Sequence, residues 1–293
     1  MRFTVTACST SRPPTASAVR CGGGSNLLPR DITRLTNSPP KETSPSQRRY
    51  AVTEPETLPA SAARLNRTLS SASPADVIAT AARSIASGRL AVVSSFGTES
   101  AVLLKYVADV DRSLPVLFLD TGWLFDETLT YRDELVRYFG LKDVRSLKPQ
   151  IELIERRDPA RDLWLNDTDS CCHIRKVRPL SDALGAFDGW INGRKRFHGG
   201  ARANITYVET DGRLLKFNPL AALTKAALDE VFASSGAPRH PLEKMGFSSV
   251  GCMPCTSRTV AGEDTRAGRW RNSSRTECGI HRIGEPAGAG CGC

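Results

Sequence analysis

Four of the nine cysteines are spaced as ligands of a metal centre. Two adjacent residues, Cys171 and Cys172, precede a Cys-x-x-Cys pair at Cys252 and Cys255. Four thiolates are a ligand set for zinc or for an iron–sulfur cluster. Adjacent ligands strain one tetrahedral ion but suit the separated corners of a larger cluster, so the spacing favours [4Fe–4S] over zinc. A set of buried free cysteines is the alternative, and the polar neighbours of Cys171 and Cys172 disfavour it.

A fifth cysteine, Cys278, lies among basic residues that include Arg275 and His281. Positive neighbours lower the pKa of a thiol and favour the nucleophilic thiolate. Cys278 is therefore a candidate nucleophile. The alternative is a spare cysteine in a tail, beside a surface histidine.

Two groups of basic residues could bind anions. Arg266 and Arg269 are three residues apart and would share one face of a helix or turn, while Arg202 follows a second basic run at 194–196. Guanidinium groups match phosphate and sulfate oxygens in a bidentate way. Each group is also compatible with a solvated basic face, unless the fold brings both to one cleft.

Two apolar runs, at 90–95 and 115–119, predict buried strands that end in polar loops. Ligands of open parallel sheets bind beyond the carboxyl ends of the strands, and a helix N-terminus there attracts a phosphate. Ordinary turns with helix caps are the alternative at each loop. The candidate nucleotide-binding residues of the two loops are Ser95, Phe96, Gly97, Asp120, Thr121 and Gly122.

The elements around these loops alternate between strand and helix. Such alternation predicts an α/β fold, a parallel twisted sheet flanked by helices. Ser73 and Pro74 are expected to start the first helix, as its N-cap and first residue. The expected helices are 73–87, 98–109, 125–139 and 220–235, and the further strands are 189–192 and 214–217.

Composition divides the chain into three parts. Residues 1–74 are rich in Ser, Thr, Pro and Arg, and we expect a disordered extension, although its start also resembles a transit peptide. Residues 75–260 are the expected core, which would bind the nucleotide and the cluster. Residues 261–293 form an expected mobile C-terminal segment that carries Cys278, and Cys291 and Cys293 lie at its end.

The charge and the apolar content exclude several classes of protein. The net charge is +9, and residues 1–50 hold 8 basic and 2 acidic residues, which leaves +3 for the rest. This balance does not indicate nucleic-acid binding. No apolar run approaches the ~20 residues of a membrane span. An odd number of clustered cysteines without a secretory leader predicts a cytoplasmic protein. The sequence is compatible with a homo-oligomer.

Over residues 75–282 the sequence resembles the family of adenylyl-sulfate (APS) and phosphoadenylyl-sulfate reductases. The motifs that carry the resemblance are Ser-Ser-Phe-Gly at 94–97, Leu-Asp-Thr-Gly at 119–122, Cys-Cys-His-Ile-Arg-Lys-Val-Arg-Pro-Leu at 171–180, Asn-Pro-Leu at 218–220, Gly-Cys-Met-Pro-Cys-Thr at 251–256, Gly-Glu-Asp-Thr-Arg-Ala-Gly-Arg-Trp at 262–270 and Glu-Cys-Gly-Ile-His at 277–281.

The resemblance implies an adenine-nucleotide hydrolase-like fold and a thioredoxin-dependent, assimilatory reduction of adenylyl sulfate to sulfite and AMP. It implies that Cys278 forms an S-sulfonate, which thioredoxin or a similar dithiol then cleaves. It also implies a [4Fe–4S] cluster on the other four cysteines. The substrate-binding residues that it implies, beyond those of the two loops, are Lys176, Arg202, Arg266, Arg269 and His281.

Two departures from the family pattern affect these expectations. Residues 193–200 lack the Gln-Ser that relatives carry, and residues 221–224 lack the usual tryptophan. The alternative functions are a phosphoadenylyl-sulfate reductase with a cluster, a cluster-containing tRNA-thiolating enzyme of the ATP-pyrophosphatase type, and a non-enzymatic nucleotide sensor.

Overall fold

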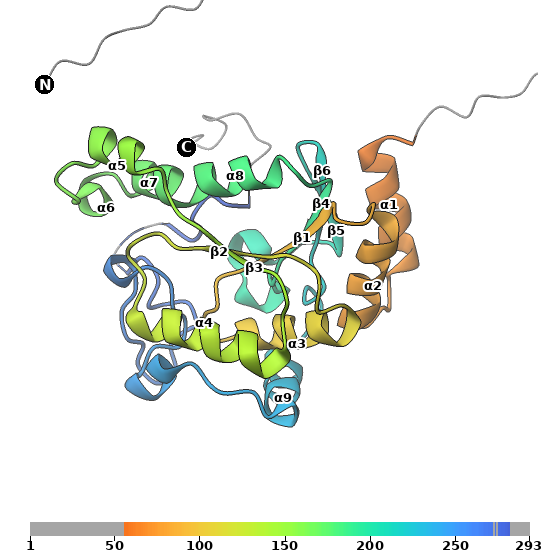
Figure 1. Ribbon diagram of the computed structural model, residues 1–293. Helices are drawn as coiled ribbons and strands as arrows, with labels where there is room; N and C mark the ends of the chain where they lie inside the picture. The colour runs from red at the N-terminus through yellow and green to blue at the C-terminus, as the bar shows by residue number, and fades with distance from the viewer. Residues whose placement is uncertain (1–55, 272, 274, 282–293) are drawn as a thin grey trace, which may run out of the picture. The chain divides into compact units, whose positions relative to one another are not determined.

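The computed structural model describes residues 56–271, 273 and 275–281, and every structural statement below concerns these residues. They form a six-stranded sheet in the order β3-β2-β1-β4-β6-β5, in which all pairs are parallel except β5 with β6 (Figure 1). The strands are β1 Leu90–Ser94, β2 Val116–Leu119, β3 Val144–Leu147, β4 Gly189–Ile191, β5 Val208–Asp211 and β6 Leu214–Phe217.

Helices cover both faces of the sheet. The α-helices are α1 Leu58–Thr68, α2 Pro74–Ser84, α3 Ser100–Val110, α4 Asp126–Phe139, α5 Ile151–Arg157, α6 Leu163–Asn166, α7 Thr168–Cys172, α8 Arg178–Leu184 and α9 Lys225–Ser235. Five of them, α1, α2, α3, α4 and α9, pack against one face, and α8 packs against the other. A π-helix, η1 His173–Val177, and the 3-10 helices η2 Arg196–His198, η3 Gly200–Arg202, η4 Pro241–Met245 and η5 Met253–Cys255 complete the set.

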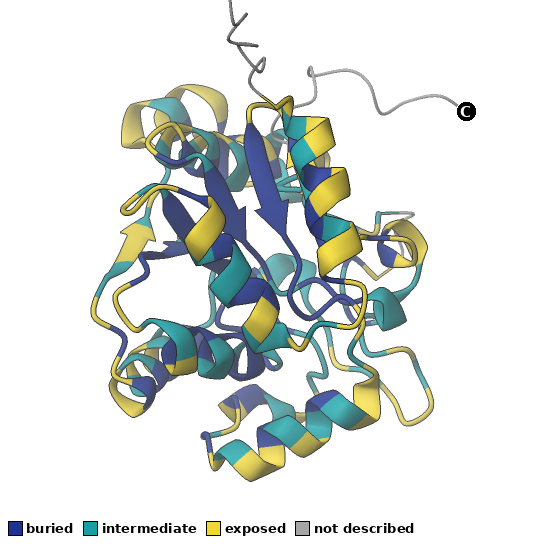
Figure 2. Cartoon of the chain, turned by 90° about the vertical axis from the view of Figure 1, so that its right-hand side faces the viewer, coloured by how far each residue is buried: buried dark blue, intermediate teal, exposed yellow. Residues whose placement is uncertain are grey.

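Strand β1 lies at the centre of the core. Its residues Leu90 and Val92 pack into the larger apolar cluster with α1, α2, α3, α4 and α9, while Ala91 and Val93 pack with α8. Figure 2 shows the central strands buried, while exposed positions lie on the helices and on the edge strand β3. A parallel strand covered on both faces reads as a continuous apolar run, which is why this strand is visible in the sequence.

The structure confirms the expected α/β fold and the four expected strands to within one residue. Ser73 caps α2 in a capping box with Asp76, and Pro74 is the first residue of that helix, as predicted. The late helix begins at Lys225 and not at 220, because Thr224 caps it and residues 219–222 form turns. The sequence did not predict strand β3, because Arg145 and Ser146 are exposed on this edge strand and interrupt its apolar pattern.

The sequence predicted that residues 1–74 are disordered, and this prediction is wrong from residue 58 onward. Helix α1 occupies Leu58–Thr68 and buries Ala62 and Leu65. Asn66 donates its amide to the carbonyl of Val208 at 2.8 Å and accepts the Val208 N–H at 3.0 Å, which ties α1 to β5. A narrow apolar stripe is enough for a helix that covers a sheet edge, although the segment looks polar as a whole.

Other expectations fall outside the described residues, namely those for residues 1–55 and 282–293, which include Cys291 and Cys293. Among the residues that are described, no helix is long and apolar enough to cross a membrane.

Candidate active site

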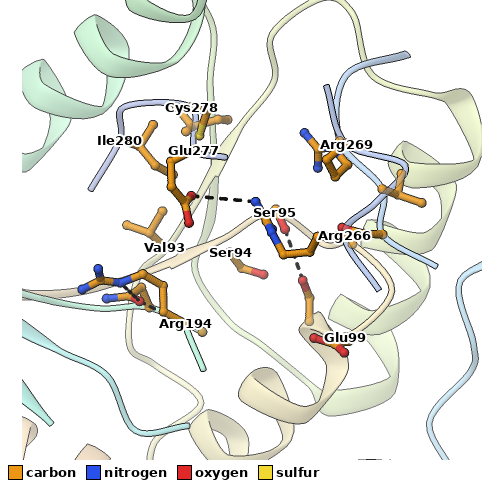
Figure 3. A pocket seen from close by; sticks show the side chains of 18 of the residues that line it. Val93, Ser94, Ser95, Glu99, Arg194, Arg266, Arg269, Glu277, Cys278 and Ile280 are labelled. Atoms are coloured by element: carbon orange, nitrogen blue, oxygen red, sulfur yellow. Dashed lines mark hydrogen bonds and ion pairs between the residues drawn. The ribbon is translucent and has the colours of Figure 1, made fainter. Parts of the chain in front are cut away.

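A pocket lies at the carboxyl ends of β1, β2 and β4, where the chain leaves the sheet. It gathers the loop after β1, the segment after β4, and parts of the chain at 249–252, 266–270 and 277–281 (Figure 3). The sequence-predicted residues that line it are Ser95, Gly97, Thr121, Lys176, Arg202, Cys252, Arg266, Arg269, Cys278 and His281. The fold therefore brings both basic groups and the candidate nucleophile to one cleft.

Three residues of the predicted loops do not line this pocket. Phe96 is fully buried and meets the Phe118 ring edge-on at 5.3 Å, so its side chain belongs to the core. Asp120 closes its own turn, because its Oδ1 accepts the Gly122 N–H at 3.2 Å. Gly122 has a φ of 74°, a left-handed conformation that favours glycine. These three residues shape the loops from outside the pocket wall.

The loop after β1 packs closely against the segment at 248–250. A Cβ atom on Gly97 would lie 3.2 Å from the carbonyl oxygen of Val250, and Thr98 donates its hydroxyl to the carbonyl of Ser248 at 2.9 Å. Helix α3 then starts at Ser100, a pocket residue, with no side-chain cap, so N–H groups of its first turn lack a side-chain acceptor. The Ser95 and Ser100 hydroxyls lie 3.4 Å apart.

A buried polar cluster that the sequence did not reveal lies beside this loop. Lys195 Nζ lies 2.6 Å from Glu99 Oε2, and His198 Nε2 lies 3.1 Å from the same oxygen. Burial raises the pKa of Glu99, but the charges and hydrogen bonds of Lys195 and His198 outweigh it and hold the pKa far below its usual value. Glu99 and its partners are about a hundred positions apart in the chain, so no local motif marks them.

The four predicted cluster ligands come from two segments. Cys171 and Cys172 lie at the end of α7, Cys252 and Cys255 flank η5, and all four are free thiols. Burial raises the pKa of Cys171 to about 11, and the charges of Cys252 and Cys255 contribute to the increase. Helix α6 contacts both α7 and η5, which places the two segments in one neighbourhood. Within the described part of the chain, however, no three His, Cys, Asp or Glu side chains are grouped as ligands of one ion.

The end of β2 reaches this neighbourhood. Thr121 Oγ1 lies 3.2 Å from Cys252 Sγ, and the Arg175 guanidinium donates to the Thr121 carbonyl at 2.9 Å. Arg175 also pairs with Asp158 at 2.7 Å, and both of these side chains are buried. The donor set fits a cluster in chemistry, since it consists of four thiols with nearby cationic and hydroxyl groups.

Lys176 stands between the cysteines and the pocket. It lies in the π-helix that follows Cys172, and it lines the pocket. Burial lowers the pKa of Lys176, but the negative charges of Cys252, Cys278 and Cys172 outweigh it and raise the pKa above its usual value. Lys176 is therefore a cation that faces sulfur atoms of the cluster cysteines and of Cys278.

The segment that carries Cys278 packs over the same pocket. Arg275 donates to the Glu277 carbonyl at 2.8 Å and forms an ion pair with Asp169 beside Cys171. The His281 ring stacks on Trp190 with centroids 5.8 Å apart and planes within 5°. The His281 carbonyl accepts a 2.7 Å hydrogen bond from Lys216. Cys278 is half-buried between these anchors.

Arg269 is held close to the Cys-x-x-Cys turn. Its Nε donates to the Cys255 carbonyl at 3.4 Å, and its guanidinium lies 4.6 Å from the Trp270 ring centroid. A Cβ atom on Gly251 would lie 2.2 Å from Arg269 Nη2, so only glycine leaves room for this arginine. Gly251 is thus a site residue whose role the sequence alone did not show.

The charges of the pocket suit a substrate with several anionic groups. Its lining includes two carboxylates, Glu99 and Glu277, against six cations. These cations are Lys176, Arg194, Lys195, Arg202, Arg266 and Arg269. With histidines neutral the lining carries 6 − 2 = +4, beside a helix N-terminus and a cysteine thiol. Such a site can bind a phosphate-linked group and present it to a nucleophilic sulfur.

Comparisons with other proteins agree with this geometry. The sequence pattern described as the phosphoadenosine phosphosulfate reductase domain matches residues 89–258. A protein of Mesorhizobium japonicum named adenosine 5'-phosphosulfate reductase is 43% identical over 77% of this chain and 89% of its own. One of the same name from Chelativorans is 46% identical over 67% and 80%.

A solved structure shows the same fold. The phosphoadenylyl-sulfate reductase of Candida auris, crystallised as a phosphate complex, superposes with a TM-score of 0.56 at 22% sequence identity. The superposition covers 67% of this chain and 96% of that one.

Proposed function

Because the chain belongs to the phosphoadenosine phosphosulfate reductase family, we propose that it reduces adenylyl sulfate to sulfite and AMP for sulfate assimilation in the cytoplasm. The electrons come from thioredoxin or a similar dithiol. The observation that carries this proposal is the position of Cys278, whose thiol lines a cationic pocket at the ends of the parallel strands.

The reaction takes place in two covalent steps. The Cys278 thiolate attacks the sulfur of the sulfate group, the bond from that sulfur to the bridging oxygen breaks, and AMP leaves with the electron pair. Cys278 then carries an S-sulfonate. A thiolate of the dithiol attacks Cys278 Sγ and releases sulfite with two electrons, and its second thiol resolves the mixed disulfide. The dithiol ends oxidised and the Cys278 thiol is restored.

The cations of the pocket stabilise the charge that this attack develops. Lys176, Arg266 and Arg269 line the pocket with Cys278. Charge grows on the sulfate oxygens and on the leaving phosphate during the attack, and fixed cations lower the energy of that charge. The loop at 95–100 and the N-terminus of α3 hold the nucleotide phosphate.

The ligands of a [4Fe–4S] cluster in this proposal are Cys171, Cys172, Cys252 and Cys255. A bound cluster would supply a rigid link between α7 and η5 and a fixed charge beside Lys176. This chain's own residues orient that link, because Thr121 contacts Cys252 and Arg175 contacts the Thr121 carbonyl. The covalent chemistry stays with Cys278.

The test is sulfite release by the purified full chain with reduced thioredoxin. We expect turnover of adenylyl sulfate at a kcat/KM well above that of phosphoadenylyl sulfate. Turnover that prefers the 3'-phosphorylated nucleotide would assign the related reductase activity. The absence of sulfite from both nucleotides, with the cluster loaded, would contradict the proposal.

A further inference from the structure

The side chain of Glu277, directly before Cys278, occupies the cationic part of the pocket. The Arg202 guanidinium donates two hydrogen bonds to the Glu277 carboxylate, from Nη2 to Oε2 at 2.8 Å and from Nε to Oε1. Arg266 Nη2 lies 3.9 Å from Oε2. Figure 3 shows Glu277 and Arg266 facing each other across the pocket, with Cys278 beside Glu277. A carboxylate of the chain thus sits where an anion of the substrate would be attracted.

The geometry of this contact is that of an oxyanion site. A guanidinium that gives two parallel hydrogen bonds to a carboxylate can give the same two to sulfate or phosphate. The other carboxylate of the pocket, Glu99, is held by Lys195 and His198. Glu277 is therefore the pocket carboxylate whose removal would free Arg202 for a ligand.

The same arginines also hold the backbone next to the nucleophile. Arg266 Nη2 donates to the Thr276 carbonyl at 2.9 Å, so it contacts both the main chain before Glu277 and the Glu277 side chain. Arg202 also lies 3.1 Å from His198 Nδ1, which fixes its other side. The placement of the Glu277–Cys278 segment depends on these arginines, since Glu277 is the side chain that connects it to Arg202.

We propose that Glu277 fills an anion subsite of Arg202 and Arg266 when substrate is absent, and that an incoming sulfate or phosphate group displaces it. Displacement releases the segment that bears Cys278 from Arg202, so occupancy of the subsite is coupled to repositioning of the nucleophile. Glu277 is a positioning residue and takes no part in the covalent steps. The inference rests on the proposed function only in that the displacing anion belongs to the substrate.

The exchange has a measurable consequence for affinity. An internal anion that occupies the subsite lowers the apparent affinity for any external anion. The reason is that only the molecules with an open subsite can bind the external anion. Removing the Glu277 charge while keeping its shape should therefore tighten the binding of a simple anion. Inorganic sulfate is a suitable probe, because it can use the fork of Arg202 without the nucleotide.

The first experiment measures the Kd of inorganic sulfate by titration calorimetry on the cluster-loaded full chain. We expect Glu277→Gln to bind sulfate at least 10-fold more tightly than the unmodified chain. Glu263→Gln is the matched control, because it removes the same charge from a carboxylate whose partner is Arg271 and not an arginine of the subsite. An equal gain in both variants, or no gain in Glu277→Gln, would overturn the proposal.

The second experiment uses the unmodified chain and so does not depend on the folding of a variant. The rate at which iodoacetamide alkylates Cys278 is measured by peptide mass spectrometry, in sulfate and in chloride at equal ionic strength. We expect sulfate to raise the rate at least 3-fold in the unmodified chain and to give no increase in Glu277→Gln. A nearby sulfate charge would by itself slow alkylation, because it disfavours a negative charge on the sulfur, so electrostatics cannot mimic the expected sign.

A rate in the unmodified chain that falls or stays constant in sulfate would contradict the displacement. Neither experiment measures sulfite release. A chain that fails as a reductase but shows both effects would leave the subsite inference standing, and the reverse result would leave the proposed function standing.

Discussion

The Thr121 hydroxyl lies 3.2 Å from the Cys252 thiol, across 131 positions of sequence. Both atoms are buried, and the contact joins the end of strand β2 to the Cys-x-x-Cys turn. The same hydroxyl accepts the Trp123 N–H at 3.2 Å. One side chain therefore connects the predicted nucleotide-binding loop with a predicted cluster ligand, and the first prediction concerns it.

Replacing Thr121 by Val keeps the shape of the side chain but removes its oxygen. The Trp123 N–H then loses its acceptor and Cys252 its polar neighbour, so we expect a loss of about 1–3 kcal/mol in the free energy of unfolding. Thr121→Ser keeps the hydroxyl and should lose less. Urea unfolding of the three chains measures the difference, and a Val variant as stable as the unmodified chain would show that the hydroxyl contributes nothing.

Cys278→Ser and Cys255→Ser should fail in different ways. We expect the Cys278 variant to retain its iron and its AMP binding but to release no sulfite, because serine is a far weaker nucleophile than a thiolate. The Cys255 variant should lose iron and visible absorbance, because one ligand is missing. Iron analysis and sulfite assays on both proteins check the division of roles, which sulfite release by Cys278→Ser would contradict.

Lys176→Met should reduce kcat while the chain stays folded. Lys176 is the cation that faces both cysteine groups from the pocket wall. Loss of one fixed charge that stabilises a transition state costs about 100- to 1,000-fold in kcat. Single-turnover formation of the S-sulfonate, followed by mass spectrometry, separates this effect from substrate binding. An unchanged rate of that step would remove Lys176 from the proposed mechanism.

Arg175→Met should destabilise the fold strongly. The ion pair of Arg175 and Asp158 is buried, with side chains 5% and 0% exposed. Removing one partner leaves an uncompensated buried carboxylate, which costs about 3–5 kcal/mol.

The control for this change is Arg178→Met, which breaks the ion pair of Arg178 with Asp182. Those side chains are 56% and 47% exposed, so the expected cost is about 0–1 kcal/mol. Thermal and urea unfolding of both variants measure the difference in stability. Similar losses in the two variants would contradict the importance of burial.

Because His240 is buried, we expect the folded protein to lose stability on mild acidification. His240 is fully buried between Thr128 and the Leu242 N–H, and burial lowers its pKa to about 4. In the unfolded chain the pKa is about 6.5. The stabilisation by the neutral ring is therefore complete above pH 6.5 and is lost as the pH falls from 6.5 towards 4, by up to about 3 kcal/mol.

Urea unfolding between pH 7.5 and 5 measures this dependence. His240→Asn can still accept the Leu242 N–H but does not titrate, so we expect a shallower decline of stability in that variant. Parallel pH profiles of the two chains would show that His240 is not the source.

The local signals of the sequence suffice for the central strands and for the types of residue in the site. Strand β1 is an uninterrupted apolar run because α8 covers one face and the larger core covers the other. The four paired cysteines and the paired arginines could be proposed as candidates from their spacing and residue type. Cys278 was proposed from its basic neighbours and the family resemblance. Helix α1 and strand β3 were missed, because their polarity reflects positions at the edges of the sheet.

Only the tertiary structure decides which of these residues meet. It shows that the Phe96 side chain packs in the core and does not line the pocket. It also shows that Glu99, Lys195 and His198 form a buried cluster at the pocket. It also sets Glu277 against Arg202, although 75 positions separate them. The chemistry of each side chain is a local property of the sequence. Distance, burial and pairing arise only when the ends of several strands converge, because the crossover connections bring distant segments to one edge of the sheet.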